Sequence, residues 1–154
     1  AFGHERIVSI DIDTVKLPAA AAAGAAATLS GRDVDAAQKL KALTGGALYG
    51  AVDFVGSTDT ANLALSALRK GGKLILVGLF GGEMQLSIGS TILRAITVQG
   101  SHLGGVEELK AVVALAREGK LKPIPIETRP LSEVSRTLDE LKAGKIVGRV
   151  VAAV

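Results

Sequence analysis

AVDFVGSTDTANLALSALRKGGKLILVG, residues 51–78, is the stretch that decides the fold. It holds two apolar runs, residues 51–55 and 73–77, each of which ends at a glycine. Between them lies a segment with helical spacing that Thr58 is expected to cap. Its inward-facing residues are expected to be Leu63, Leu65 and Leu68. Strand, helix and strand at this spacing predict a βαβ unit with two parallel strands.

The same alternation continues in both directions along the chain. Further strands are expected over residues 6–11, 26–29, 96–99 and 149–154, and further helices after Pro18 and over residues 33–43, 106–118 and 131–143. Right-handed crossovers place helices on both faces of such a sheet. The sequence therefore predicts an α/β protein with a Rossmann-like, doubly wound parallel sheet.

Two of the expected helices carry more detailed predictions. In the helix over residues 33–43, the apolar stripe formed by Ala37, Leu40 and Leu43 is expected to face the core. The helix after Pro18 is almost entirely alanine, and no polar side chain follows until Thr28. We expect this helix to be covered on both sides, unless some of the alanines are not the natural residues.

One element of the doubly wound fold is missing from the sequence. No G-x-G-x-x-G motif occurs, and residues 1–3 read as the tail of a helix with Gly3 as its left-handed cap. We expect the first strand and its glycine-rich loop to precede Ala1, so that the fold lacks its first βα unit and the chain is a fragment. The strands over residues 6–11 and 51–55 then lose their common neighbour, at roughly 1–3 kcal/mol for each buried backbone group left unpaired.

Composition narrows the class of protein. The 154 residues carry 18 Lys and Arg against 15 Asp and Glu without a run of like charge, which disfavours nucleic-acid binding. The absence of cysteine excludes disulfides and Cys-based zinc sites within this chain. The apolar stretches are short and no secretory signal is visible, so we expect a cytoplasmic protein that does not interact with membranes.

Few residues are candidates for chemistry. Asp11 closes an apolar strand, where a carboxylate can accept hydrogen bonds from both hydroxyls of a ribose; a helix cap or a solvated turn residue is the alternative. Lys16 lies one turn further on and either reaches the same ribose or faces solvent. Arg149 opens the last strand and either binds a diphosphate or makes a surface ion pair. His4 and His102 lack ligand spacing, so no metal site is expected.

Several segments resemble the zinc-dependent, medium-chain alcohol dehydrogenases, in order over nearly the whole chain. They are residues 7–11 (IVSID), 52–56 (VDFVG), 67–72 (ALRKGG), 76–81 (LVGLFG), 100–104 (GSHLG), 114–120 (ALAREGK) and 145–150 (KIVGRV). The resemblance implies NAD-dependent oxidation of an alcohol to an aldehyde or ketone, with the catalytic zinc bound upstream of this chain. It also implies a homodimer or homotetramer, and a chain that is inactive alone.

The resemblance implies roles by position. Asp11, assisted by Lys16, would bind the adenosine ribose and favour NAD over NADP, and Arg149 would contact the diphosphate. Val55 and Gly56 would border the cofactor at one strand end. The nicotinamide side would be lined at two further strand ends by Val77, Gly78, Leu79, Ser101 and Leu103. No residue is assigned to catalysis or to zinc. Residues 1–129 would form a partial NAD-binding domain, and residues 130–154 would return toward a catalytic domain.

Two other interpretations stay open. A zinc-free quinone or enoyl reductase of the same superfamily shares this half but usually prefers NADP, and Asp11 argues against it. A non-catalytic α/β binding or assembly module could instead use the apolar edge over residues 96–99 to dimerise by extending the sheet.

Overall fold

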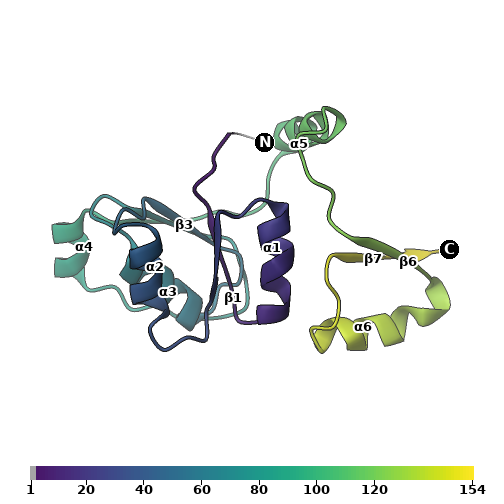
Figure 1. Ribbon diagram of the computed structural model, residues 1–154, viewed down its shortest axis with the longest axis horizontal. Coiled ribbons are helices and arrows are strands. Elements are labelled where there is room, and N and C mark those ends of the chain that lie inside the picture. Colours follow the sequence, from purple (N-terminus) through teal and green to yellow (C-terminus); the bar gives the residue numbers. More distant parts are fainter. Residues whose placement is uncertain (1–2) are drawn as a thin grey trace. The chain divides into compact units, whose positions relative to one another are not determined.

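A computed structural model describes residues 3–154 of the chain (Figure 1). It divides into two compact units, Gly3–Glu107 and residues 108–154, and each is described by itself. The helix tail expected over residues 1–3 falls mostly on Ala1 and Phe2, which lie outside the described residues. Gly3 has the expected left-handed conformation, with φ of 68°.

Two parallel sheets make up the unit Gly3–Glu107. Strand β1 (Val8–Asp11) pairs with β2 (Ala27–Ser30), and the strand order of the other sheet is β3 (Gly50–Asp53), β4 (Lys73–Leu76) and β5 (Thr97–Gly100). Every strand pair is parallel. The expected parallel α/β architecture is confirmed.

Helices connect these strands. They are the short 3-10 helix η1 (Thr14–Lys16) and the α-helices α1 (Leu17–Ala23), α2 (Ala36–Leu43), α3 (Thr58–Ala67) and α4 (Ile88–Arg94). Figure 1 shows α1 and α2 on opposite sides of β1, as right-handed crossovers require. Helix α4 was not predicted from the sequence, because its seven residues are too few to show a helical period.

The strand pairing leaves one position of the doubly wound order empty. In that order the strand before β1 would lie between β1 and β3. No hydrogen-bonded strand of residues 3–154 occupies this position, and the sheet is therefore split into the pair β1–β2 and the triplet β3–β4–β5. This matches the prediction of a Rossmann-like sheet without its first βα unit.

The core of this unit joins the two sheets through helices α2 and α3. One buried cluster consists of Leu29, Ala36, Leu40 and Ala67, with Val8, Ile10, Leu48 and Leu63 packed against it. Ala61, Leu68 and Leu74 of this unit are buried as well. The predicted stripe on α2 is wrong at one position, since Leu43 is 51% exposed. Ala36 and Leu40, four residues apart, face Ala67 of α3, whereas Leu43 is the last residue of the helix and lies beyond this contact.

Three further local predictions need correction. Helix α3 is capped by Ser57 rather than Thr58, because Ser57 and Thr60 form a reciprocal capping box. Strand β3 ends at Asp53, two residues earlier than expected. Helix α1 is not covered on both sides, because Ala21, Ala22 and Ala23 are exposed. Its other face packs on β1 and β2.

Residues 108–154 contain most of α5 (Val106–Arg117) and one further βαβ unit. Strand β6 (Ile126–Pro130) is followed by η2 (Leu131–Glu133), α6 (Val134–Lys142) and β7 (Arg149–Ala153), and the two strands pair in parallel. Strand β6 was not predicted, because its sequence Ile-Glu-Thr-Arg-Pro has one strongly apolar residue and ends in proline.

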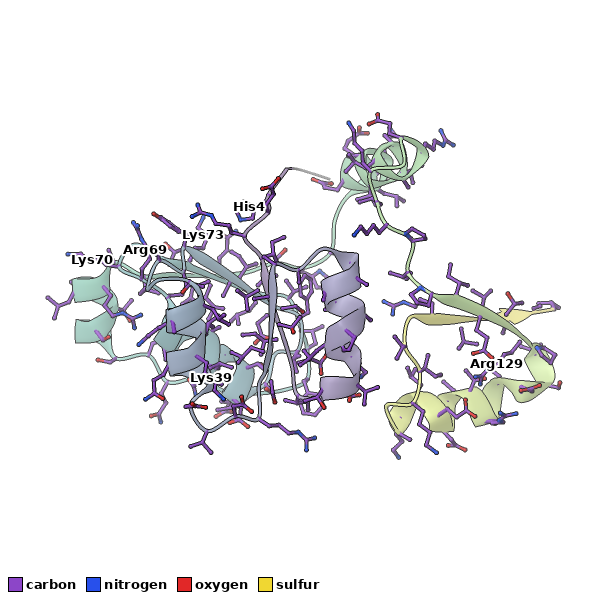
Figure 2. The ribbon with its side chains drawn as sticks, in the orientation of Figure 1. His4, Lys39, Arg69, Lys70, Lys73 and Arg129 are labelled. Atoms are coloured by element: carbon purple, nitrogen blue, oxygen red, sulfur yellow. The ribbon has the colours of Figure 1, made fainter. Side chains whose placement is uncertain are left out.

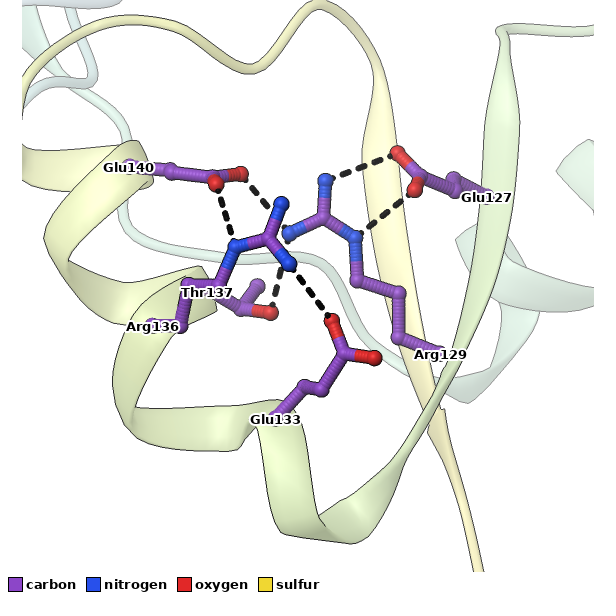
Figure 3. Close-up of polar contacts among 6 residues, drawn as sticks. All are labelled: Glu127, Arg129, Glu133, Arg136, Thr137 and Glu140. Atoms are coloured by element: carbon purple, nitrogen blue, oxygen red, sulfur yellow. Dashed lines mark hydrogen bonds and ion pairs between the residues drawn. The ribbon is translucent and has the colours of Figure 1, made fainter.

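Ion pairs join β6 to α6 (Figure 3). The guanidinium of Arg129 donates to Glu127 and to Glu140, each at 2.7 Å, and Arg136 donates to Glu140 at 2.9 Å. Hydrogen bonding to Arg129 lowers the pKa of Glu127 and of Glu140, with Arg136 adding to the effect at Glu140. The same contacts raise the pKa of Arg129.

Surface ion pairs also join helix α2 to the segment before it. Lys39 lies on this helix (Figure 2) and its ammonium is 2.7 Å from Asp33 and 3.0 Å from Asp35. Hydrogen bonding to these two carboxylates raises the pKa of Lys39.

Across residues 3–154, no helix combines the length and the apolarity needed to cross a bilayer.

Candidate functional site

Asp11 is the last residue of β1, and part of its carboxylate is held in a local turn. One oxygen, Oδ1, accepts a hydrogen bond from the backbone N–H of Asp13 at 2.8 Å, and the Asp11 carbonyl accepts from Gly31 at 3.0 Å. The side chain is half-buried. This geometry fixes the direction of the carboxylate and leaves Oδ2 without a hydrogen bond from residues 3–154, which suits a pair of vicinal hydroxyls.

Lys16 is engaged with another carboxylate. Its ammonium lies 3.5 Å from Oδ2 of Asp13, and both side chains are 35% exposed. An ion pair this exposed contributes little stability, so the lysine can exchange this partner for a ligand at small cost. Its assistance to Asp11 remains a prediction.

The ends of the three strands in the other sheet are aligned. The register pairs Asp53 with Leu76 and Leu76 with Gly100. The candidate residues after these ends therefore leave the sheet at one edge, the carboxyl edge, where ligands bind in open α/β sheets. This group consists of Val55, Gly56, Val77, Gly78, Leu79, Ser101 and Leu103.

A buried carboxylate organises the turn after β3. Asp53 is 6% exposed, and its Oδ1 accepts hydrogen bonds from the N–H groups of Val55 at 2.9 Å and Gly56 at 3.0 Å. Its Oδ2 accepts from the hydroxyl of Thr60 on α3 at 2.9 Å. The turn that carries Val55 and Gly56 is thereby tied both to the strand and to the helix.

The loop after β4 lies directly against this turn. The N–H groups of Val77 and Gly78 donate to the carbonyl of Asp53, at 2.9 and 3.0 Å, and Phe80 donates to Val55 at 3.0 Å. A Cβ added to Gly56 would collide with the carbonyl of Gly78. Gly56 also has φ of 75°, so a side chain there is excluded on two grounds.

Apolar side chains are exposed at this edge. Leu79 is 88% exposed, Leu103 83% and Val55 48%. Leu103 adopts φ of 55°, a conformation that costs a residue with a Cβ roughly 1–2 kcal/mol. Ser101 is exposed, and its N–H donates to Leu76 at 2.9 Å, which extends the pairing of β4 and β5 by one residue. Exposed leucines beside strand ends are available to a ligand with an apolar face.

Arg149 belongs to residues 108–154, where it is the first residue of β7. It pairs with Ile126 of β6, and its exposed side chain donates to the carbonyl of Gly148 at 2.9 Å. No ion pair joins it to a carboxylate within residues 3–154. A guanidinium without a carboxylate partner suits an anionic ligand, and the contact of Arg149 with the diphosphate remains a prediction.

The residues described do not fit a zinc site. His4 and His102 are both exposed, and no group of three or more His, Asp or Glu within residues 3–154 is arranged to hold a metal ion. The chain has no cysteine. No chemical step is therefore assigned to zinc on these residues.

Sequence reasoning missed Asp53 and Thr60. Asp53 was treated only as part of an apolar run, although a carboxylate inside such a run must find hydrogen-bond donors if the strand is buried. That rule was the available signal. The partner, seven residues along at Thr60, becomes evident only from the geometry of the turn.

Comparison with known proteins gives consistent results. Residues 1–118 match the family described as zinc-binding dehydrogenases. An alcohol dehydrogenase of Moraxella sp. (strain TAE123) is 35% identical over 145 residues, and an NAD-dependent alcohol dehydrogenase of Sulfurisphaera tokodaii is 31% identical over 146 residues. Each alignment covers 94% of this chain and 42% of the relative.

A solved structure agrees with these sequence matches. The alcohol dehydrogenase of the archaeon Aeropyrum pernix superposes with a TM-score of 0.85 at 32% identity, over 96% of this chain and 42% of that protein. The chain thus spans less than half the length of the relatives it matches. The resemblance seen in the sequence is confirmed, and the chain belongs to the zinc-binding dehydrogenase family.

Proposed function

We propose that this chain is most of the NAD-binding part of an alcohol dehydrogenase, which oxidises an alcohol to an aldehyde or ketone by hydride transfer. The observation that carries the proposal is the carboxylate of Asp11 at the carboxyl end of a parallel strand, with one oxygen fixed by Asp13 and the other open. Two relatives with more than 30% identity also support it, since one is named alcohol dehydrogenase and the other NAD-dependent alcohol dehydrogenase.

The first proposed contacts with the cofactor are at its adenosine end. Asp11 accepts hydrogen bonds from both ribose hydroxyls through its two oxygens, and Lys16 assists from one turn away. A 2′-phosphate in place of one hydroxyl would be repelled by the carboxylate, which favours NAD over NADP. Arg149 contacts the diphosphate through its guanidinium.

At the nicotinamide end, the carboxyl edge of β3, β4 and β5 supplies the contacts. The N–H groups of Val77 and Gly78 already donate to Asp53. The loop therefore offers carbonyl oxygens, which accept from the carboxamide NH₂ and orient the ring. Val55, Leu79 and Leu103 present apolar surface that excludes water from the ring. When bound, NAD supplies the hydride acceptor.

Other properties of the whole protein are part of the same proposal. A catalytic zinc is bound outside this chain, the substrate is a small alcohol, and the protein is cytoplasmic and forms a homodimer or homotetramer. Residues 1–129 form the partial NAD-binding domain, and residues 130–154 return toward a catalytic domain. The chain alone is expected to be inactive.

An activity assay of the whole protein that contains this chain tests the proposal. We expect alcohol-dependent formation of NADH, followed by its absorbance, with NAD much preferred over NADP. Reduction of a quinone or an enoyl substrate by NADPH, without alcohol oxidation, would favour the zinc-free reductase instead. No affinity for either dinucleotide would favour a non-catalytic module.

A further inference from the structure

We infer that Asp53 is a positioning residue for the cofactor: its carboxylate sets where the backbone of Val55 and Gly56 lies at the nicotinamide end of the site. The inference rests on the proposed function, since it assumes that a dinucleotide binds along this edge. Asp53 itself is buried and is not expected to touch the ligand.

The contacts of Asp53 show what the carboxylate does. Two backbone N–H groups of the turn converge on Oδ1 and the Thr60 hydroxyl donates to Oδ2. Burying a carboxylate is costly unless it is hydrogen-bonded, and here donors from the turn and from α3 compensate, with no ion pair to a cation within residues 3–154. The shape of the turn and the burial of the charge therefore depend on each other.

The same residue also controls the neighbouring loop. Its carbonyl accepts from Val77 and Gly78, while its side chain holds Val55 and Gly56. Asp53 is thus hydrogen-bonded to both backbone segments that are proposed to contact the nicotinamide, the turn after β3 and the loop after β4. A shift of the turn would be transmitted to the second loop through Gly56 and Gly78, whose backbones are too close to admit a Cβ.

Two variants separate positioning from simple structural support. Asp53→Ala removes both acceptor oxygens. Asp53→Asn keeps one oxygen for the two N–H groups, and its amide can donate to Thr60, whose hydroxyl can donate to the carbonyl of Ser57 3.1 Å away. Asp59→Ala is the matched control, because Asp59 is an exposed carboxylate in the first turn of the same helix.

The experiment measures the Kd for NADH by fluorescence and the melting temperature of each variant in the whole protein. We expect Asp53→Ala to bind NADH at least about ten-fold more weakly at temperatures where it is folded, because errors of about 1 Å in position are costly. Asp53→Asn should stay within about two-fold of the wild type, as should Asp59→Ala.

The outcomes distinguish failure of the positioning role of Asp53 from failure of the proposed NAD-binding function. A wild-type protein that does not bind NADH contradicts the proposed function. A wild type that binds, with Asp53→Ala folded and equal to Asp59→Ala in affinity, overturns the positioning role alone. If Asp53→Ala does not fold, Thr60→Val replaces it, because it removes the donor to Oδ2 and leaves the two N–H donors to Oδ1 in place. It also removes the Thr60 half of the capping box, so Ser57→Ala, which breaks the other half and keeps that donor, is measured beside it. Weaker NADH binding by Thr60→Val than by Ser57→Ala supports the inference, and equal binding overturns it.

Discussion

Replacing Asp11 with serine removes a negative charge from the carboxyl end of β1 while keeping a short polar side chain. In the whole protein, the repulsion of a 2′-phosphate should disappear together with the paired hydrogen bonds to the ribose. We therefore expect the ratio of kcat/KM for NAD to that for NADP to fall by about ten-fold or more, a change of about 1.4 kcal/mol.

Asp13→Ser is the matched control for this substitution. Asp13 lies two residues away, donates its N–H to Asp11 and pairs with Lys16. The variant keeps that N–H but removes a second carboxylate from the same loop. A specific role for Asp11 requires that the cofactor ratio change more in Asp11→Ser than in Asp13→Ser; an equal change in both would show only a general effect of charge.

At the scale of single elements, the ion pairs between β6 and α6 predict a pH dependence of stability. The pKa values of Glu127 and Glu140 lie below their ordinary value of 4.5, mainly because Arg129 donates hydrogen bonds to both. A group whose pKa is lowered by folding stabilises the fold above its ordinary pKa. That stabilisation is lost as the pH falls through the lower, folded-state value.

Thermal unfolding at a series of pH values checks this prediction. The melting temperature should fall as the pH drops below about 4.5, and Arg129→Met should flatten that part of the curve because the cause of the lowered pKa is gone. The effect should shrink at high salt, since Glu127 is 59% exposed and the pairs are screened. Parallel curves for the wild type and Arg129→Met would contradict the assignment.

The regular elements could be predicted where their period was clear. Strands β3 and β4 and helix α3 follow from apolar runs and leucine spacing. The strand ends were misplaced by one or two residues, and α3 ends at Ala67, before the expected stop at Gly71 and Gly72. Helix α4 and strand β6 were missed, because one is short and the other is mostly polar. The end of β3 was misplaced because the Asp53 side chain turns the chain there.

In the candidate site, too, some residues could be predicted from the sequence and others could not. The positions of Asp11 and of the strand-end glycines could be predicted from the sequence, because they follow from the parallel sheet, whereas their contacts with the cofactor stay a prediction. Asp53 carried a signal, as a carboxylate inside an apolar run, but its partners, Thr60 among them, could not be identified, since the contacts depend on two oxygens meeting donors from separate elements. Residues that line a site can thus be read from the order of elements, whereas residues that support it require three-dimensional geometry.

At the scale of the whole molecule, the split between β1–β2 and β3–β4–β5 leaves room in the doubly wound order for one more strand. The central claim is that these two groups of strands together bind one NAD molecule. The most direct test is a crystal structure of the whole protein with NAD bound. We predict that the Asp11 carboxylate lies within about 3 Å of both hydroxyls of the adenosine ribose. Density for NAD that leaves Asp11 facing solvent, away from the ribose, would contradict the claim.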